Sequence, residues 1–235
     1  ERTGRVAVIT YNRPEALNAV NGQLRKDLNA AWETLRTDDE AWVAIVTGNG
    51  KAFCAGADLK DPGSSVGNDD HSFWEVPSFT SLESGKEIFK PVIAAVNGYA
   101  IGFGLTMVAS CDFVIASDRA EFGFPEVQLG VPTVQGAVRM PKRVGWQNAM
   151  ELLLLGDRVD AQRAKEMGLV MKVVPHDELM AEATDLAERL INNSAPLAVR
   201  ATKEIARRGQ EMGFVEAIRF GETMRKVAGA TEDAK

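Results

Sequence analysis

One glutamate has the surroundings of an acid–base group. Glu126 is the only ionisable side chain in residues 122–130, an apolar segment bracketed by Gly123 and Gly130. Burial among apolar side chains raises the pKa of a carboxyl group toward neutrality, which suits it to transferring protons in either direction. A glutamate taken at random more often caps backbone N–H groups. The catalytic interpretation therefore depends on what lies near it.

Two junctions rich in small residues are candidates for stabilising negative charge. They occupy residues 53–60 and residues 97–104, and the second contains Gly98, Gly102 and Gly104. Small residues let a ligand approach main-chain N–H groups, and the first N–H groups of a helix are unpaired and favour anions. If the junctions are neighbours in space, N–H groups from both form an oxyanion hole. Tight helix–strand packing explains the glycines equally well, so both interpretations stay open.

Other chemistries find little support. His71 has the setting of a solvated loop residue and His176 that of a helix-start residue, and neither has a partner at metal-ligand spacing. A Ser-His-Asp apparatus has few candidates, because these are the only two histidines in the chain. Cys54 and Cys111 lie singly in apolar stretches, and residues 102–104 form a lone GxG. We therefore expect no acyl-enzyme hydrolase, no metal site and no nicotinamide or nucleotide site.

The composition is that of an ordinary globular protein. The 235 residues include 27 basic and 33 acidic side chains, with a formal net charge of -6, and 45% are hydrophobic. This length suits one large or two small domains. An acidic chain without clustered lysine and arginine is a poor partner for nucleic acid. Two cysteines outside any paired framework favour a reducing cytosol, so a cytoplasmic location is expected.

One apolar stretch has the length of a membrane-spanning helix. It covers residues 92–109, but Gly98, Gly102 and Gly104 interrupt it, which favours a buried strand, a tight turn and the start of a buried helix. The chain begins with Glu1 and runs directly into a strand pattern, so no leader peptide is expected. The sequence therefore predicts no membrane association.

Strand and helix patterns alternate along the chain, which predicts an α/β fold. Apolar, β-branched runs predict buried strands over residues 6–11, 42–47, 92–96 and 113–116. Helical periodicity predicts a helix from about residue 22 and further helices over residues 82–89, 104–110, 146–155, 161–167, 178–191 and 197–208. We expect a core in residues 1–175 and a helical appendage in residues 176–235.

A polar stretch interrupts this alternation at residues 61–72. Its proline, glycines, serines and aspartates predict an exposed, mobile loop. Phe73, Trp74 and Phe79 follow it. These aromatic side chains either line an apolar ligand pocket or anchor the loop to the core, and the sequence favours neither.

The chain resembles the enoyl-CoA hydratase/isomerase (crotonase) family over essentially its whole length. The matching stretches are residues 12–19, 53–60, 90–98, 111–112, 122–130, 155–158 with Ala161, and 168–170. The resemblance implies a crotonase-like spiral of repeated ββα units and a C-terminal helical region used in oligomer contacts. The expected assembly is a homotrimer or a dimer of trimers. The implied substrate is an acyl-CoA thioester, with coenzyme A as part of the substrate and no separate cofactor or metal.

The resemblance also assigns site residues. The backbone N–H groups of Ala57 and Phe103 take the positions of the family's oxyanion donors, and Glu126 that of an acid–base group. Phe103 stands where the family usually has glycine, but a main-chain donor does not need a particular side chain. The neighbourhood that holds the adenine and pantetheine of coenzyme A is matched by Ala16, Leu17, Ala55, Asp58, Leu59 and Lys60, and Lys60 suits a phosphate.

Two departures from the family pattern affect the expected reaction. Hydratases of the family typically use two glutamates, and Thr106 stands at the first position, where it can orient a water but not transfer a proton. The glycine-rich run of the family is replaced at residues 132–136, which makes the acyl pocket unusual. Hydration of a 2-enoyl-CoA has the higher family base rate, whereas a Δ3 to Δ2 double-bond shift fits a single carboxylate. A CoA-ester-binding protein without turnover is the alternative of another class, and RNA binding is a distant third.

Overall fold

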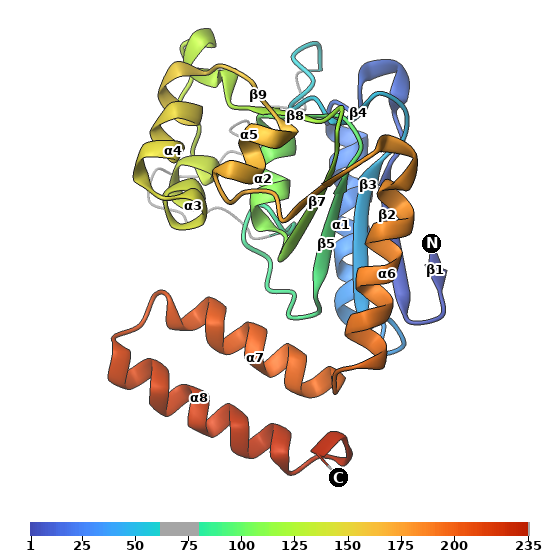
Figure 1. Ribbon diagram of the computed structural model, residues 1–235, viewed down its shortest axis with the longest axis vertical. Coiled ribbons are helices and arrows are strands. Elements are labelled where there is room, and N and C mark those ends of the chain that lie inside the picture. The colour runs from blue at the N-terminus through green and yellow to red at the C-terminus, as the bar shows by residue number, and fades with distance from the viewer. Residues whose placement is uncertain (62–79, 235) are drawn as a thin grey trace.

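Two β-sheets form the centre of the computed structural model, which describes residues 1–61 and 80–234 (Figure 1). The larger sheet has the strand order β1-β2-β3-β5-β7-β10. These strands are Arg2–Thr3, Val6–Tyr11, Val43–Gly48, Val92–Val96, Phe113–Ser117 and Lys172–Val174. The smaller sheet has the order β4-β6-β8-β9. Its strands are Ala52–Cys54, Tyr99–Ile101, Glu121–Gly123 and Val159–Asp160.

Successive turns of the chain place one strand in each sheet. The pairs β3 and β4, β5 and β6, and β7 and β8 follow one another along the chain, and parallel pairing joins each strand to its equivalent in the next turn. Parallel strands need crossover connections, and a helix at residues 22–37 connects β2 to β3 while one at residues 103–110 connects β6 to β7. The predicted spiral of ββα units is therefore present, and strands β3, β5 and β7 confirm the apolar runs of the sequence.

Helices α1 and α6 cover opposite faces of the larger sheet (Figure 1). Helix α1, Gly22–Thr37, buries Leu28, Trp32 and Leu35 in one cluster, and α6, Leu179–Asn192, buries its apolar side in another. Further helical elements are α2 Phe103–Ser110, α3 Gln135–Val144, α4 Trp146–Met150, the π-helical turn η4 Glu151–Leu155, α5 Ala161–Glu166, α7 Pro196–Gly209 and α8 Phe214–Gly229. Short 3-10 helices are η1 Pro14–Ala16, η3 Pro125–Leu129, η5 His176–Glu178 and η6 Glu232–Ala234.

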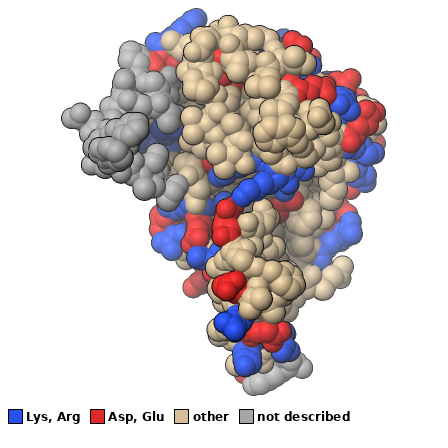
Figure 2. Space-filling model, turned by 90° about the vertical axis from the view of Figure 1, so that its left-hand side faces the viewer, with Lys and Arg blue, Asp and Glu red and all other residues tan. Residues whose placement is uncertain are grey.

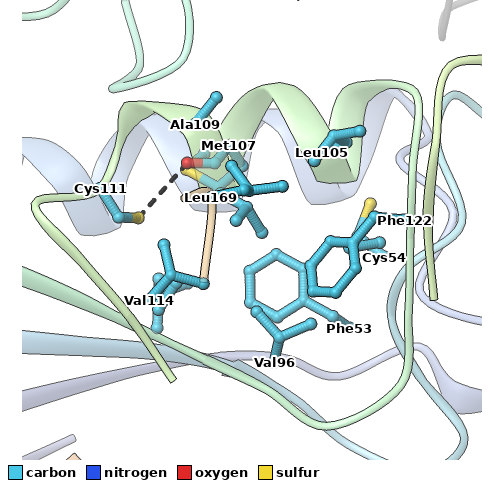
Figure 3. Close-up of a cluster of buried hydrophobic side chains, with 14 of the residues drawn as sticks. Phe53, Cys54, Val96, Leu105, Met107, Ala109, Cys111, Val114, Phe122 and Leu169 are labelled. Atoms are coloured by element: carbon cyan, nitrogen blue, oxygen red, sulfur yellow. Dashed lines mark hydrogen bonds between the residues drawn. The ribbon is translucent and has the colours of Figure 1, made fainter. Parts of the chain in front are cut away.

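The hydrophobic core lies between α2 and the two sheets (Figure 3). Phe53 and Phe122 of the smaller sheet pack there with Val96 and Val114 of the larger one. Both cysteines belong to this core and are free thiols. Burial raises the pKa of each thiol to about 12, so neither is a nucleophile in the folded protein.

The structure contradicts one predicted helix. Residues 82–89 contain turns and irregular backbone instead of a helix. Gly85 has a φ of 116°, outside the helical region, and the hydroxyl of Ser84 bonds the backbone of Ser81 at 2.9 Å. Serine side chains that bond nearby backbone groups compete with the helical ladder. The predicted loop at residues 61–72 and the aromatic residues Phe73, Trp74 and Phe79 lie outside the described residues, apart from Asp61.

The C-terminal helices extend away from the sheets as an antiparallel pair, α7 and α8 (Figure 1). Lys203 of α7 joins this pair to the body, because its ammonium group bonds Asp112 at 2.6 Å and the carbonyl oxygen of Lys90 at 2.8 Å. Figure 2 shows the side that carries α3 and α4, where uncharged residues cover much of the upper body. Among the described residues, none of the helices combines the length and apolar character needed to cross a membrane.

Candidate active site

The two junctions predicted to stabilise negative charge are neighbours in the smaller sheet. Strand β4 pairs in parallel with β6, with Cys54 opposite Ala100. A Cβ atom at Gly104 would overlap the carbonyl oxygen of Cys54, and one at Gly56 would lie 3.3 Å from the carbonyl oxygen of Ile101. Glycine at these positions therefore permits the first turn of α2 to pack directly against the end of β4.

The proposed main-chain donors, Ala57 and Phe103, follow these contacts. Ala57 is exposed and pairs with Val20 in an isolated β-bridge, and Phe103 is the first residue of α2. Within residues 1–61 and 80–234, neither residue donates its backbone N–H to another group. Both N–H groups thus remain available to a ligand, as is usual at a helix start.

Glu126 follows both junctions in the sequence and lies beside the second one. It lies in the 3-10 helix η3, which ends at Gly130, and Val131 N–H bonds its carbonyl oxygen at 3.0 Å. A Cβ atom at Gly102 would stand 2.9 Å from Glu126 Oε1, so the carboxyl group abuts the residue that precedes α2. The structure therefore brings Glu126 and the Phe103 junction together.

The carboxyl group of Glu126 is partly desolvated. Its Oε2 is buried and has no hydrogen-bond partner among the described residues, and the same holds for Thr133 Oγ1. Burial raises the pKa of Glu126, while its own backbone N–H and the nearby Thr133 hydroxyl act in the opposite direction. A raised pKa suits a carboxyl group to accept and donate protons.

Thr106 lies in α2, one turn after Phe103. It is only 6% exposed, and its carbonyl oxygen accepts a 2.8 Å bond from Ser110 Oγ. Its backbone N–H bonds the carbonyl oxygen of Gly102 at 2.9 Å. The position that carries a glutamate in typical hydratases is therefore inside the protein and close in sequence to the junction.

The residues expected to hold coenzyme A come from two segments that meet. Ala55 N–H bonds the carbonyl oxygen of Leu17 at 3.0 Å, which places the end of η1 beside the end of β4. Asp58 accepts bonds from Arg13 at 2.5 Å and from Lys60 N–H at 3.0 Å. Arg13 is the main cause of the lowered pKa of Asp58. Ala16 lies beside Leu17 in η1, and Leu59 (82% exposed) and Lys60 are at the surface.

Asn18 fixes these two segments, and the sequence analysis missed it. Its side chain is fully buried, accepts a 2.8 Å bond from Arg13 N–H, and donates to the carbonyl oxygens of Asn49 and Ala52 at 2.9 and 2.7 Å. Its φ of 58° lies in the left-handed region that asparagine tolerates better than most residues. The only available signal was an asparagine that follows an Asn-Arg-Pro turn.

Replacing Asn18 by alanine is expected to lower the free energy of unfolding by about 2–4 kcal/mol, because buried backbone partners lose their hydrogen bonds and alanine resists a positive φ. Urea unfolding of the variant and the wild type measures this difference. Asn193→Ala, at an exposed helix end, is the matched control and should change stability by less than about 0.5 kcal/mol. Equal effects of the two substitutions would contradict the role of Asn18.

Metal chemistry was not expected from the sequence. Within the part of the chain that the structure describes, no three His, Cys, Asp or Glu side chains are grouped as metal ligands. His176 lies in η5, where Nδ1 is 3.1 Å from Ser117 Oγ, while His71 lies outside the described residues.

The comparisons with known proteins agree on one family. The family described as enoyl-CoA hydratase/isomerase matches residues 1–235. A probable enoyl-CoA hydratase of Rhizobium meliloti is 40% identical over 236 residues, which cover 100% of this chain and 90% of the relative. A short-chain-enoyl-CoA hydratase of Clostridium acetobutylicum is 38% identical and is covered to 90%, with 100% of this chain matched.

A solved structure supports the same assignment. The enoyl-CoA hydratase of Mycobacterium tuberculosis superposes with a TM-score of 0.89 at 35% identity, covering 100% of this chain and 90% of that one. The spiral of paired strands that the two structures share is the crotonase fold. This chain is a member of the enoyl-CoA hydratase/isomerase family.

Proposed function

We propose that this protein hydrates a trans-2-enoyl-CoA at the site formed by Glu126, Ala57 and Phe103. The observation that carries the proposal is the contact of the Glu126 carboxyl group with Gly102, immediately before the first N–H groups of α2. That arrangement places an acid–base group beside candidate oxyanion donors. The names of the relatives, which include probable and short-chain enoyl-CoA hydratases, support the same reaction.

The reaction needs one acid–base group and hydrogen-bond donors that stabilise negative charge on the thioester oxygen. The N–H groups of Ala57 and Phe103 polarise the thioester oxygen, and Glu126 accepts a proton as water attacks Cβ. The π electrons of the double bond move toward the thioester oxygen and form an enolate. Glu126 then returns the proton to Cα, which restores the carboxylate and completes the addition of water. Thr106 orients water by hydrogen bonding instead of transferring a proton.

Coenzyme A itself lies along the two segments joined by Leu17 and Ala55. The exposed ammonium group of Lys60 suits a phosphate, and Leu59 offers an apolar surface next to it. Ala16 and Asp58 complete this edge, with Asp58 held by Arg13. We propose that the reaction uses no cofactor other than the coenzyme A of the substrate, so dialysis against a chelator should leave the activity unchanged.

Two substrates distinguish hydration from double-bond migration. With a short trans-2-enoyl-CoA, hydration removes the conjugated chromophore, whereas with a trans-3-enoyl-CoA, isomerisation creates it. We expect rapid loss of conjugation in the first assay. Gain of conjugation alone would replace the hydratase proposal by the isomerase one, and binding of both esters without conversion would indicate a CoA-ester-binding protein.

The pH profile provides a separate check on Glu126. Because burial raises its pKa, the ionised form is lost at a higher pH than for an ordinary glutamate, whose pKa is about 4.3. The acid limb of kcat/KM should therefore lie above about pH 4.3, provided that circular dichroism shows an intact fold across the limb. An acid limb at or below that value would contradict Glu126 as the desolvated base.

We also propose that the protein assembles as a homotrimer through its C-terminal helices. Phe214 is 80% exposed, and Val215 and Ile218 are exposed on the same helix, α8. Apolar patches of this kind mark contacts between proteins. Sedimentation equilibrium should give three times the mass of one chain, and Phe214→Ser should shift the population toward smaller species. A monomeric wild type would refute the assembly without affecting the proposed reaction.

A further inference from the structure

A second buried carboxyl group lies outside the machinery assigned above. Glu83 is only 4% exposed, and its Oε1 accepts a hydrogen bond from Ser81 Oγ. Its Oε2 is buried and has no hydrogen-bond partner among the described residues. Buried polar atoms in native proteins nearly always have a partner, so this carboxyl oxygen is a candidate hydrogen-bond partner for a ligand. Burial also raises the pKa of this group.

Arg139 connects Glu83 to helix α2. Arg139 donates from Nη2 to the carbonyl oxygen of Glu83 at 2.8 Å and from Nε to Ser110 Oγ at 2.9 Å. At the other end of the helix, the guanidinium of Arg25 lies over the ring of Phe103, 5.3 Å from its centroid. Both arginine charges act on the Glu83 carboxyl group and lower its pKa. Arg139 therefore joins Glu83 to the C-terminal end of α2.

The side of α2 that faces these arginines also carries Thr106. Phe103, Thr106 and Ser110 are spaced at three and seven residues, so they share one stripe of the helix. Thr106 is thus one turn from the Phe103 N–H and lies between the residues that contact Arg25 and Arg139. The stripe therefore leads from the candidate oxyanion donor to Ser110, which Arg139 joins to Glu83.

A second unpaired polar atom lies in the same region. The hydroxyl of Tyr11 is buried and has no hydrogen-bond partner among the described residues. The charge of Glu83 contributes to the raised pKa of both Tyr11 and Cys54. Two buried, unpaired polar atoms are poor neighbours for a purely alkyl group.

We propose that Glu83 determines acyl specificity, and that the site accepts a short acyl chain whose hydroxyl group donates a hydrogen bond to Glu83 Oε2. This inference rests on the proposed function, which places the thioester oxygen at the Phe103 N–H. From there, an acyl chain that follows the stripe passes Thr106 and arrives at Glu83. The guanidinium groups of Arg25 and Arg139 disfavour a cationic substituent, whereas a neutral hydroxyl is compatible with both.

An unsubstituted chain would leave the carboxylate oxygen unpaired and exclude water from it. A site built to bond a substrate hydroxyl rejects the analogue that lacks it, because its buried polar groups then remain unpaired. We expect the wild type to use 5-hydroxy-trans-2-pentenoyl-CoA or its 4-hydroxy isomer with a kcat/KM at least about 10-fold above that of trans-2-pentenoyl-CoA.

Substitution of Glu83 tests the proposal. In Glu83→Leu, the ratio of the two kcat/KM values should fall by about 10-fold or more. In Glu83→Gln, the amide oxygen can still accept a hydrogen bond, so the ratio should fall less. The ratio is taken within one preparation, so partial misfolding affects both substrates equally. Glu87→Gln is the matched control, because Glu87 is an exposed glutamate of the same segment that pairs with Arg208 at 2.8 Å. It should leave the ratio unchanged.

The outcomes separate this inference from the proposed function. If wild type and variants hydrate trans-2-pentenoyl-CoA with the same ratio throughout, the acyl assignment is overturned, Glu83 binds only water, and the hydratase proposal stands. If the wild type hydrates neither ester, the proposed function fails. Calorimetry with saturated 5-hydroxypentanoyl-CoA and pentanoyl-CoA then decides the acyl assignment, which requires tighter binding of the hydroxylated ester in the wild type but not in Glu83→Leu.

Discussion

Glu126→Gln is expected to reduce kcat by about two to four orders of magnitude, the usual loss when a positioned acid–base group is removed. Glutamine has nearly the same shape, so it can occupy the space beside Gly102, but its amide cannot accept a proton from water. Binding of a saturated acyl-CoA should change little, because the groups proposed to hold coenzyme A are elsewhere. Steady-state kinetics and calorimetry measure the two quantities.

A nearby glutamate supplies the control for this substitution. Glu121 lies in β8, five residues before Glu126, and pairs at the surface with Arg158 at 3.5 Å. Glu121→Gln removes the same charge from the same part of the chain without touching the junction, and its kcat should remain near that of the wild type. Turnover of Glu126→Gln at the wild-type rate would refute the assignment of the base.

Gly102→Ala is expected to lower kcat/KM by about 100-fold. The new Cβ atom would lie 2.9 Å from Glu126 Oε1, so the carboxyl group or the start of α2 must shift. A displacement of about 1 Å from a productive geometry can cost two orders of magnitude in rate. The residue also has a φ of 56° and a ψ of -115°, a conformation that L side chains rarely adopt, so thermal stability should fall as well.

Gly130→Ala separates backbone strain from displacement of the carboxyl group. Gly130 has a φ of 75°, but a Cβ atom there has no atom within 4 Å. Both alanine variants should therefore unfold at lower temperature than the wild type, and only Gly102→Ala should lose most of its activity. If Gly130→Ala lost activity to the same extent, strain in the segment and not contact with Glu126 would explain both results.

Strands β2, β3, β5 and β7 of the larger sheet were predictable from their apolar runs, whereas the short strands β1 and β10 were not predicted. Strands β3 and β5 are buried along their whole length except Gly48, and such strands are continuous runs of apolar residues. The smaller sheet was not predicted as a sheet. Its strands have two or three residues each, which is shorter than the four to eight residues over which a strand pattern can be recognised.

Helical periodicity was misleading in one segment and insufficient in another. Residues 82–89 have suitably spaced apolar side chains, but Gly85 and the backbone bond of Ser84 favour turns. Helix α3 was missed, since Gly136 and Pro141 are poor helix formers. Its Gly136 is required by packing: a Cβ there would lie 2.7 Å from the ring of Phe124.

The candidate site was partly accessible from the sequence. Glu126 was identified by its apolar neighbours, and the two junctions by their small residues, all of which are local signals. Glu83 and Asn18 carry no such signal, because a serine-rich turn and an asparagine after a proline turn are typical of exposed loops. Their burial depends on residues far away in the sequence, such as Arg139 and Ala52.

The two buried thiols make local opening of the protein measurable by cysteine labelling. Cys54 ends β4 beside the junction that contains Ala57, and Cys111 caps the far end of α2. With a thiol pKa of about 12, each can be alkylated only in moments when its surroundings open. The labelling rates of the two cysteines therefore report separately how often the end of β4 and the C-terminal end of α2 open, and a ligand bound at the junction should slow the reaction of Cys54 more than that of Cys111.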